Sequence, residues 1–304
     1  MFPTITGHYT IILNEGTDRE QVFEQSNVIT NWFLNRFKDM STTSWGQDGI
    51  GNNTDKYIRL GLSDQPAAAT DGNLIQGVVS KVVSPSAGTD IPLTTNGAVW
   101  SMGVTFVCPM GTNVFQGTIK ELGFAFGRNN GTLGGAGDAV DSRAVLTTPI
   151  TLALTDDVTA KFTLTLTGSE TDATGSIVLD GTTYNYKVRR NQPYIYGHVI
   201  YYLQGNKSVS FYGTTASFGA VGAGITGSVA GNLNGSWVPV EAQGVRGERR
   251  LLVPFGLTEG NLSGGIKYLD WPYIGKFEFT PAIPKTSDKK LTLTLSNTVT
   301  GIAP

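Results

Sequence analysis

The sequence predicts an all-β protein made of two related β-sandwich-like domains, with one helix near the N-terminus. Gly accounts for 39 of the 304 residues, and Thr is about as common. Both residue types disfavour helices, and the mixture suits strands that are joined by many turns. Short apolar runs alternate with turn residues along most of the chain, and one series of these runs occurs twice. A chain of this length can form two domains with separate cores.

The first expected elements are a strand and a helix. Residues 8–13 form an apolar run of strand length. In residues 27–37 the apolar side chains fall at positions 28, 29, 32, 33 and 37, which is the spacing of one helix face. Ser26 or Asn27 is the expected cap of this helix. Residues 41–56 are polar and contain several Gly and Asn, so we expect a loop there.

The remainder of the first half has the pattern of successive strands. We expect strands at residues 57–62, 75–83, 99–107, 117–124, 143–151 and 160–166. The last of these alternates apolar residues with Thr, which predicts one buried and one solvated face. A Gly-rich excursion at 127–138 interrupts the series, and we interpret it as a flexible or interface loop.

The second half repeats part of the first. Three matches occur in the same order: 115–122 with 262–269, Thr148-Pro149 with Thr280-Pro281, and the Thr/Leu run 162–166 with 291–295. This order indicates that one β domain was duplicated. We expect residues 1–168 to form the first domain, which includes the helix, and residues 169–304 to form the second. The turn-prone stretch 168–175 marks the boundary.

Two further segments of the second half have clear patterns. Asp180-Gly181 separates two strand-like runs, which is a strong signal for a β-hairpin. Residues 213–235 consist largely of Gly, Ala, Ser and Thr. We expect this stretch to be a low-complexity connection that becomes ordered against a neighbour.

Charge and composition argue against several classes of function. The formal net charge is −2, the pI is about 5.7, and no basic run could neutralise a nucleic-acid backbone. No apolar run approaches the roughly 20 residues of a membrane span. The first residues lack the features of a signal peptide, so we expect a soluble chain that is not exported. The single cysteine, Cys108, lies in an apolar strand pattern, which predicts a buried, inert thiol and a reducing folding compartment.

Residue types that usually carry catalysis are sparse. The histidines are His8 and His198, and the carboxylate pairs are Asp138/Asp141 and Asp156/Asp157. Both histidines fall in strand-like patterns. Two carboxylates can support glycoside hydrolysis, and carboxylate oxygens can bind Ca²⁺, but neither pair has the spacing of a known calcium loop. The second pair lies in a short polar turn. We therefore expect no enzyme activity, no catalytic residues, no cofactor and no metal.

A group of tyrosines is the strongest candidate for a binding feature. Tyr184 and Tyr186 form one period-two pair, Tyr194 and Tyr196 form another, and Tyr201 and Tyr202 follow. Members of a period-two pair share one face of a strand. Tyrosine rings pack in sheets, anchor protein interfaces and stack on sugars. All three interpretations stay open, and the first four tyrosines are the candidate interface or glycan contacts.

The order of elements in the first half resembles small virion proteins of tailed bacteriophages, of the tail, baseplate or tail-fibre type. The series comprises the strand ending at Leu13, Asn27-Val28-Ile29-Thr30, the run from Tyr57 to Pro66, Asp71-Gly72-Asn73-Leu74, the run from Gly117 to Phe124, Ser142-Arg143-Ala144-Val145-Leu146 and Pro149-Ile150-Thr151. The resemblance covers residues 8–167, with a fainter copy at 250–296. It implies a β-rich building block, often in rings or trimers, without a catalytic site. The duplication departs from the usual single-domain pattern.

This resemblance implies a non-enzymatic structural component of the virion, assembled in the bacterial cytoplasm and placed in or attached to the tail or neck. The expected partners are further copies of the chain and other virion proteins, with no nucleic acid and no membrane insertion. Loops 41–56, 127–139 and 213–235 would supply adaptable contacts. The alternatives are a receptor- or glycan-binding module of the tail, with host surface glycan as its partner, and a capsid decoration protein. A polysaccharide depolymerase is a further alternative.

Overall fold

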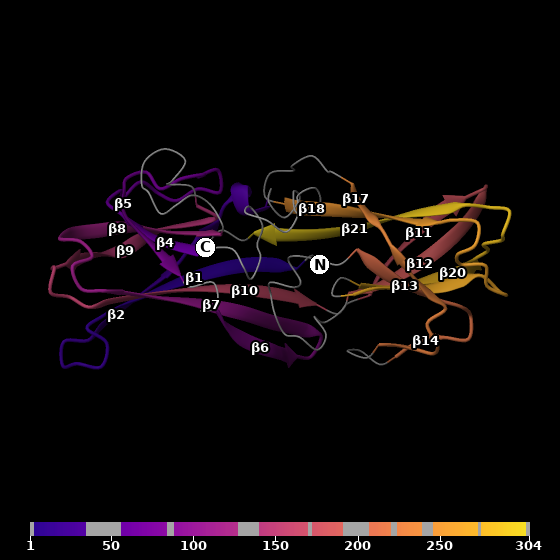
Figure 1. Cartoon of the computed structure of the whole chain (residues 1–304), viewed down its shortest axis with the longest axis horizontal. Coiled ribbons are helices and arrows are strands. Elements are labelled where there is room, and N and C mark those ends of the chain that lie inside the picture. Colours follow the sequence, from indigo (N-terminus) through magenta and orange to yellow (C-terminus); the bar gives the residue numbers. More distant parts are fainter. Residues whose placement is uncertain are drawn as a thin grey trace.

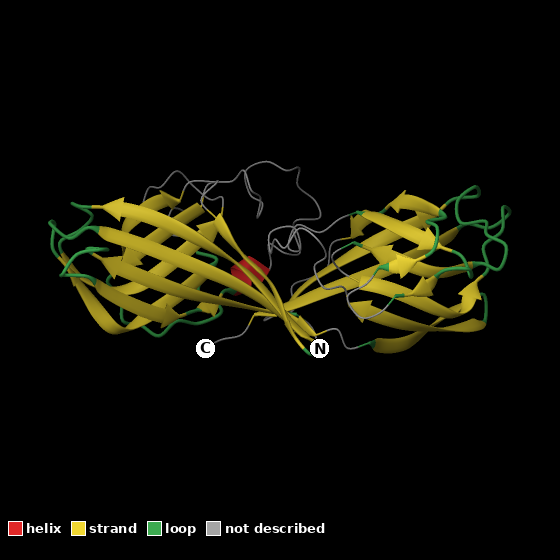
Figure 2. Cartoon of the chain, turned by 90° about the horizontal axis from the view of Figure 1, so that it is seen from below, coloured by secondary structure: helices red, strands yellow, loops and turns green. Residues whose placement is uncertain are grey.

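The computed structural model describes residues 3–34, 56–83, 88–126, 140–169, 172–190, 207–219, 224–238, 246–272 and 275–301. The molecule is elongated and has two lobes, each built from strands (Figures 1 and 2). Among the described residues, only 31–34 are helical. The predicted all-β fold is confirmed.

The first lobe is a sandwich of two antiparallel layers. One layer has the order β6–β7–β10–β1–β2 and the other has the order β3–β9–β8–β4–β5. The strands are β1 (Thr4–Leu13), β2 (Gln21–Ser26), β3 (Val28–Ile29), β4 (Lys56–Gly61), β5 (Gly77–Val83), β6 (Gly88–Asn96), β7 (Val99–Gly111), β8 (Gly117–Phe126), β9 (Ser142–Leu152) and β10 (Val158–Ser169). Every second residue of β10 is buried, as its Thr/apolar alternation predicts.

The second lobe has a layer of order β17–β18–β21 and a facing layer of order β11–β12–β20–β19–β13–β16. Its strands are β11 (Ala173–Leu179), β12 (Thr182–Arg190), β13 (Ser208–Tyr212), β14 (Ser217–Phe218), β15 (Ile225–Thr226), β16 (Gly231–Asn234), β17 (Ser236–Val238), β18 (Arg246–Phe255), β19 (Ile266–Trp271), β20 (Gly275–Ile283) and β21 (Leu291–Gly301). The short strands β14 and β15 pair only with each other among the described strands.

One sheet runs through both lobes. β1 pairs along its whole length with β10, and its first residues, Thr4 and Ile5, also pair in parallel with Thr300 and Gly301 of β21. The result is an eight-stranded sheet whose main path is β17–β18–β21–β1–β10–β7–β6. Its strands cross at the waist of the molecule, between the two lobes (Figure 2). The two sandwiches are thus joined by backbone hydrogen bonds as well as by the chain.

The two lobes have matching topologies. In chain order, the strands β3 to β10 of the first lobe correspond to β12, β13 and β16 to β21 of the second. Corresponding strands have corresponding neighbours, except that β12 also pairs with β11. The pairings β4–β8, β8–β9 and β7–β10 recur as β13–β19, β19–β20 and β18–β21, all of them antiparallel. The internal duplication inferred from the Thr/Leu runs is therefore present in the strand arrangement.

Aromatic rings fill the centre of the first sandwich. The ring of Phe124 in β8 stacks on Phe162 of β10 with centroids 4.1 Å apart, and it lies 5.1 Å from Phe106 of β7. Since β8 belongs to one layer and β7 and β10 to the other, these contacts bridge the layers. Buried Tyr9 of β1 adds a polar bridge, because its hydroxyl is 2.8 Å from the Ser142 hydroxyl of β9.

The predicted helix at 27–37 is wrong in its first part. Val28 and Ile29 form β3, which pairs with Arg143 and Ser142 of β9, and both are buried. The helical residues are 31–34, and Thr30 caps them in place of Ser26 or Asn27, because its side-chain oxygen accepts a hydrogen bond from the Phe33 amide at 3.3 Å. Burial of a short β-branched pair and of the following turn gives the same apolar spacing as a helix. Residues 35–55 lie outside the described residues.

The other expected elements have mixed outcomes. The six strands expected between residues 57 and 166 all exist, with small changes at their ends, whereas β2 and β6 were not predicted. Residues 213–235 are more than a connection, because their described part contains β14, β15 and the edge strand β16. The Gly-rich stretch 127–138 lies outside the described residues.

Candidate functional site

Among the described residues, Cys108 and His8 lie on different strands, β7 and β1. Cys108 is buried in β7, as predicted, and its sulfur lies 3.6 Å from the carbonyl oxygen of Val82 in β5. Burial raises the pKa of the Cys108 thiol to about 11. His8 lies on β1 with a half-exposed side chain, 4.0 Å from Glu24. His198 and Asp138 lie outside the described residues.

Asp156 and Asp157 stabilise a turn. The carboxylate of Asp156 accepts a hydrogen bond from the backbone amide of Ala153 at 2.8 Å and another from the side chain of Asn14 at 3.2 Å. These hydrogen bonds, the backbone one foremost, lower the pKa of Asp156. The amide of Asp157 donates to the Asn14 side-chain oxygen at 3.2 Å. The pair therefore fixes the β9–β10 turn against the end of β1, as its polar-turn pattern predicts.

A buried charged cluster lies in the first lobe, around Arg143 of β9. The Arg143 and Glu121 side chains are both fully buried, and Arg143 Nη2 lies 2.9 Å from Glu121 Oε2. Arg143 Nη1 lies 2.8 Å from Asp71 Oδ2. Glu121 also accepts hydrogen bonds from the backbone amides of Ile75 and Gln76, at 3.2 and 2.7 Å.

This cluster anchors the segment between β4 and β5. Arg143 donates further hydrogen bonds to the carbonyl oxygens of Gln65 and Pro66, at 3.0 and 3.3 Å. Each charged group thus meets an opposite charge or backbone groups of the 62–76 segment. A buried charge that is satisfied in this way holds a loop in place.

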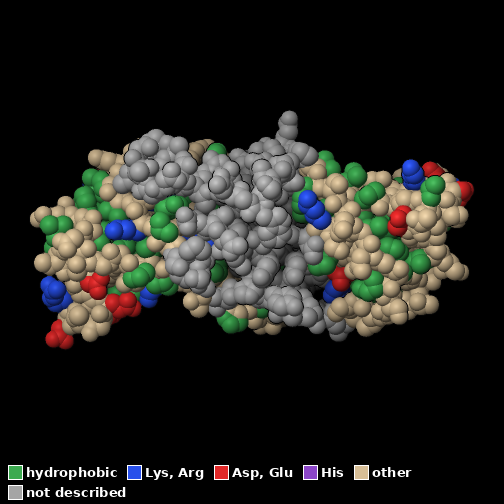
Figure 3. Space-filling model, viewed as in Figure 1, with side chains coloured by type: hydrophobic (Ala, Val, Ile, Leu, Met, Phe, Trp, Pro, Cys, Tyr) green, Lys and Arg blue, Asp and Glu red, His purple; other side chains and the backbone are tan. Residues whose placement is uncertain are grey.

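The described residues form neither a metal-binding cluster nor a helix that could span a membrane. Among the described residues, no group of three or more His, Cys, Asp or Glu side chains could hold a metal ion. No helix in the same part of the chain is long and apolar enough to cross a membrane. Charged side chains of both signs are scattered over the visible face of both lobes (Figure 3).

The candidate tyrosines divide into two groups. Tyr184 and Tyr186 lie in β12, where Tyr184 is buried, with 6% of its surface exposed, and Tyr186 is half-buried. Both pack against the core of the second sandwich, so they lie on its inner side, as their period-two spacing requires. Tyr194 and Tyr196, together with Tyr201 and Tyr202, lie outside the described residues.

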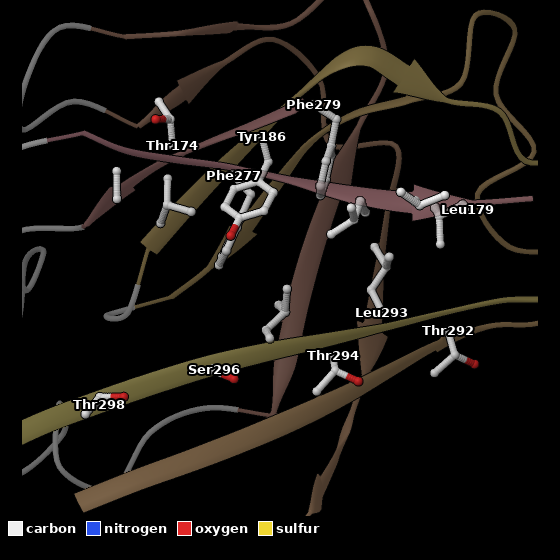
Figure 4. Close-up of a pocket in the computed structure, with 15 residues that line it drawn as sticks. Thr174, Leu179, Tyr186, Phe277, Phe279, Thr292, Leu293, Thr294, Ser296 and Thr298 are labelled. Atoms are coloured by element: carbon white, nitrogen blue, oxygen red, sulfur yellow. The ribbon is translucent and has the colours of Figure 1, made fainter. Parts of the chain in front are cut away.

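Tyr186 lines a groove between the layers of the second sandwich. The groove has a volume of about 640 Å³ and opens between β11 and β21 (Figure 4). Its walls are formed by Ala173, Thr174, Ile177, Val178, Leu179, Tyr186, Val188, Phe277, Phe279, Thr292, Leu293, Thr294, Leu295, Ser296 and Thr298. None of these residues is an acid, a Lys, an Arg or a His. The groove therefore suits a neutral occupant that is largely apolar.

The groove lies where the first sandwich has an additional strand. In the first lobe β1 pairs with β10 over ten residue pairs. In the second lobe β21 takes the place of β10, and beyond its contact with Thr4 and Ile5 no described strand pairs with this edge. The edge from Leu291 to Val299 is therefore open within the described residues, and the groove runs beside it.

The Asp180-Gly181 turn explains why β11 does not cover the edge of β21 in the way that β1 covers the edge of β10. Asp180 has φ 48° and Gly181 has φ 75°, which are the left-handed values of a tight two-residue hairpin turn. The turn folds β11 directly onto β12, with Leu179 opposite Thr182. β11 is consequently held in the β12 layer and does not lie beside β21. In the first lobe, β1 and β2 precede β3 in the chain but lie in the opposite layer.

Comparisons with known proteins add no relative. No family model, curated protein or solved structure matches this chain.

The groove was not foreseen from the sequence, although two signals for it exist. The run 291–295 repeats 162–166, but the second half has no counterpart of 8–13 that is free to pair with it. In the second half, the strand-like run 173–179 precedes the repeated segments. It ends at Asp180-Gly181, and this turn signal pairs it with the run that follows in a hairpin. Because run 291–295 is duplicated but its partner strand is not, the sequence indicates that no strand covers the edge of 291–295.

Proposed function

We propose that this chain is a non-enzymatic structural component of a tailed-bacteriophage particle, located in or attached to the tail or neck. The observation that carries the proposal is the single sheet that runs through both sandwiches by way of β1. Such a sheet fixes two similar sandwiches at the two ends of one elongated subunit (Figure 1). A subunit of this kind is suited to bridge neighbouring layers of an assembly.

The arrangement of charged residues supports a building block over an enzyme. The buried cluster around Arg143 fastens a loop, and the Asp156/Asp157 pair fastens a turn. The resemblance of the first half to virion proteins supplies the phage context. The expected partners are further copies of the chain and other virion proteins, and the expected location is the virion.

The first experiment is to measure the mass of the purified chain by light scattering at several concentrations and to probe purified phage particles with an antibody against it. A closed oligomer, or a chain that is incorporated into particles, is the expected result. A stable monomer that is absent from particles and binds bacterial surface glycan would overturn the proposal in favour of a receptor-binding module. Release of reducing sugar from host capsule would instead identify a depolymerase.

A further inference from the structure

We propose that the groove of the second sandwich binds an extended β-strand donated by another polypeptide chain of the assembly. The strand would pair with the open edge of β21 and place every second side chain between the two layers. The identity of the partner as another chain of the assembly rests on the proposed function. The geometry of the groove does not depend on that function. This mode of recognition combines backbone hydrogen bonds with pockets for alternate side chains.

The first sandwich shows what fills the corresponding position. There β1 lies antiparallel to β10, and its residues Ile5, Tyr9, Ile11 and Leu13 are buried. Ile5 and Tyr9 stand opposite Leu166 and Phe162. By the sequence match, the positions equivalent to Phe162, Leu164 and Leu166 are Leu291, Leu293 and Leu295. A donated strand would therefore bring apolar side chains to these three leucines.

The exposure of these leucines differs between the two lobes. Leu164 and Leu166 are 1% and 0% exposed, whereas their counterparts Leu293 and Leu295 are 6% and 5% exposed. Phe162 is also buried, but its counterpart Leu291 is only partly buried. Ile177, Leu179, Tyr186 and Phe277 are likewise partly buried hydrophobic residues packed against the core. A covering strand would remove this remaining apolar surface from water.

The chemistry of the groove defines the occupant. Figure 4 shows Tyr186, Phe277, Phe279 and Leu179 on one side and Leu293 with the side chains of Thr292, Thr294, Ser296 and Thr298 on the other. A charged segment would lose its hydration there without gaining an opposite charge. The occupant is therefore an extended segment with apolar residues at every second position and neutral residues between them, like the 4–13 segment of this chain.

A synthetic peptide with the sequence of residues 3–14 is a suitable probe, because β1 fills the matching position in the first lobe. We expect it to bind the full chain in a titration monitored by fluorescence anisotropy. The matched control peptide carries Ile5→Ser, Tyr9→Ser and Ile11→Ser, which keep the length and remove the alternating apolar side chains. This control should not bind measurably.

Substitutions in the chain locate the site. Ile177→Lys places a charge in the groove wall, so peptide binding should weaken about tenfold or more. Val229→Lys changes a 48% exposed residue of the same lobe that does not line the groove, and it should leave binding unchanged. Equal binding by both variants would place the peptide elsewhere and overturn the proposal. Thermal unfolding curves establish that both variants are folded.

Hydrogen exchange tests the open edge without any substitution. In the free chain, amides of residues 291–299 should exchange faster than those of the matching strand β10, which is paired on both sides. The peptide should slow exchange in β21 and β11 and leave β10 unchanged. Exchange in β21 as slow as in β10 before the peptide is added would show that the edge is already covered, which would overturn the proposal.

The other outcomes separate this inference from the proposed function. Protection of β21 that appears as the chain is concentrated, together with a doubled mass, would make a second copy the occupant and overturn the choice of partner. If the chain binds the peptide but is absent from phage particles, the strand-binding groove is supported and the proposed virion role is rejected. If the chain is present in particles but does not bind the peptide, the strand-binding groove is rejected and the proposed virion role is kept.

Discussion

Arg143 is one of two fully buried arginines in the first lobe, and it holds the loop between β4 and β5 in place. Arg143 connects the fully buried Glu121, the loop carboxylate of Asp71 and two loop carbonyl groups. An arginine can make all these hydrogen bonds because its guanidinium group presents five N–H donors in one plane. The loop between β4 and β5 is therefore fixed by electrostatics as well as by packing.

Replacement of this arginine should destabilise the whole chain. Arg143→Met leaves the Glu121 carboxylate buried without its cation, so the free energy of unfolding should fall by about 3–5 kcal/mol. Urea unfolding followed by tryptophan fluorescence measures this change. Lys120→Met is the matched control, because Lys120 forms a solvent-exposed pair with Asp64, and its loss should have little effect. Equal effects of the two variants would contradict the anchoring role.

The thiol of Cys108 should be unreactive in the folded chain. Burial holds its pKa above the ordinary value of 9.0, at about 11, so almost no thiolate forms at neutral pH. A thiol reagent should therefore label it only after denaturation. The unfolded chain loses the thiol proton from about pH 9, whereas the folded chain retains it to about pH 11. This group thus makes stability fall as the pH rises through that interval. Rapid labelling of the folded chain would contradict the assigned burial.

At the scale of the element, the Asp180-Gly181 hairpin decides the shape of the second sandwich. Gly181 adopts φ 75°, where an L side chain is strained, and no atom lies near the position of a Cβ. Gly181→Ala should therefore cost about 1–2 kcal/mol through the backbone alone. Gly72→Ala is the control, since Gly72 also has open space but no positive φ. The control should be neutral or slightly stabilising. Thermal unfolding of both variants tests the difference.

Period-two patterns were sufficient to predict most strands and the hairpin, because alternating burial leaves a direct trace in the sequence. β10 and β21 repeat the same Thr/apolar alternation, and the turn between β11 and β12 has a local signature. Among the strands that were missed are β2, with mostly exposed residues, and β6, which contains Pro92 and a register shift. A strand that buries no regular face leaves little trace in the sequence.

The erroneous helix and the unforeseen groove depend on long-range partners. Val28 and Ile29 form a strand only because Arg143 and Ser142 of β9 offer a free edge. The groove exists because β21 lies beside β18 while β11 is held in the opposite layer. A local pattern can specify a strand, but it does not specify which sheet the strand joins. Three-dimensional pairing was needed to recognise both features.

At the scale of the whole molecule, carboxylates with lowered pKa values link stability to acid. The two hydrogen bonds from Arg189, at 2.9 and 3.1 Å, lower the pKa of Asp172 beside β11, and backbone hydrogen bonding does the same for Asp156 in the first lobe. Both groups have an ordinary pKa of 3.8. Below this pH the unfolded chain binds more protons than the folded chain, so stability falls as the pH decreases further.

A series of urea unfolding curves at acidic pH measures this dependence in both lobes. The free energy of unfolding should be nearly constant above about pH 5, where carboxylates are ionised in both states, and should decrease below about pH 4. Asp172→Asn should make the free energy of unfolding decrease less steeply below about pH 4, because the variant has one fewer carboxylate whose protonation favours unfolding. An unchanged slope in this variant would show that the Asp172–Arg189 pair makes no contribution.

The position of β1 has a consequence for the order in which the chain matures during synthesis. All the pairing partners of β1 within the first lobe precede residue 170, so that lobe can close while the second is still being translated. The contact of Thr4 and Ile5 with Thr300 and Gly301 cannot form until residues 300 and 301 have left the ribosome. The backbone pairing that joins the two lobes can therefore form only after β21 has emerged, at a stage when the first lobe can already have closed.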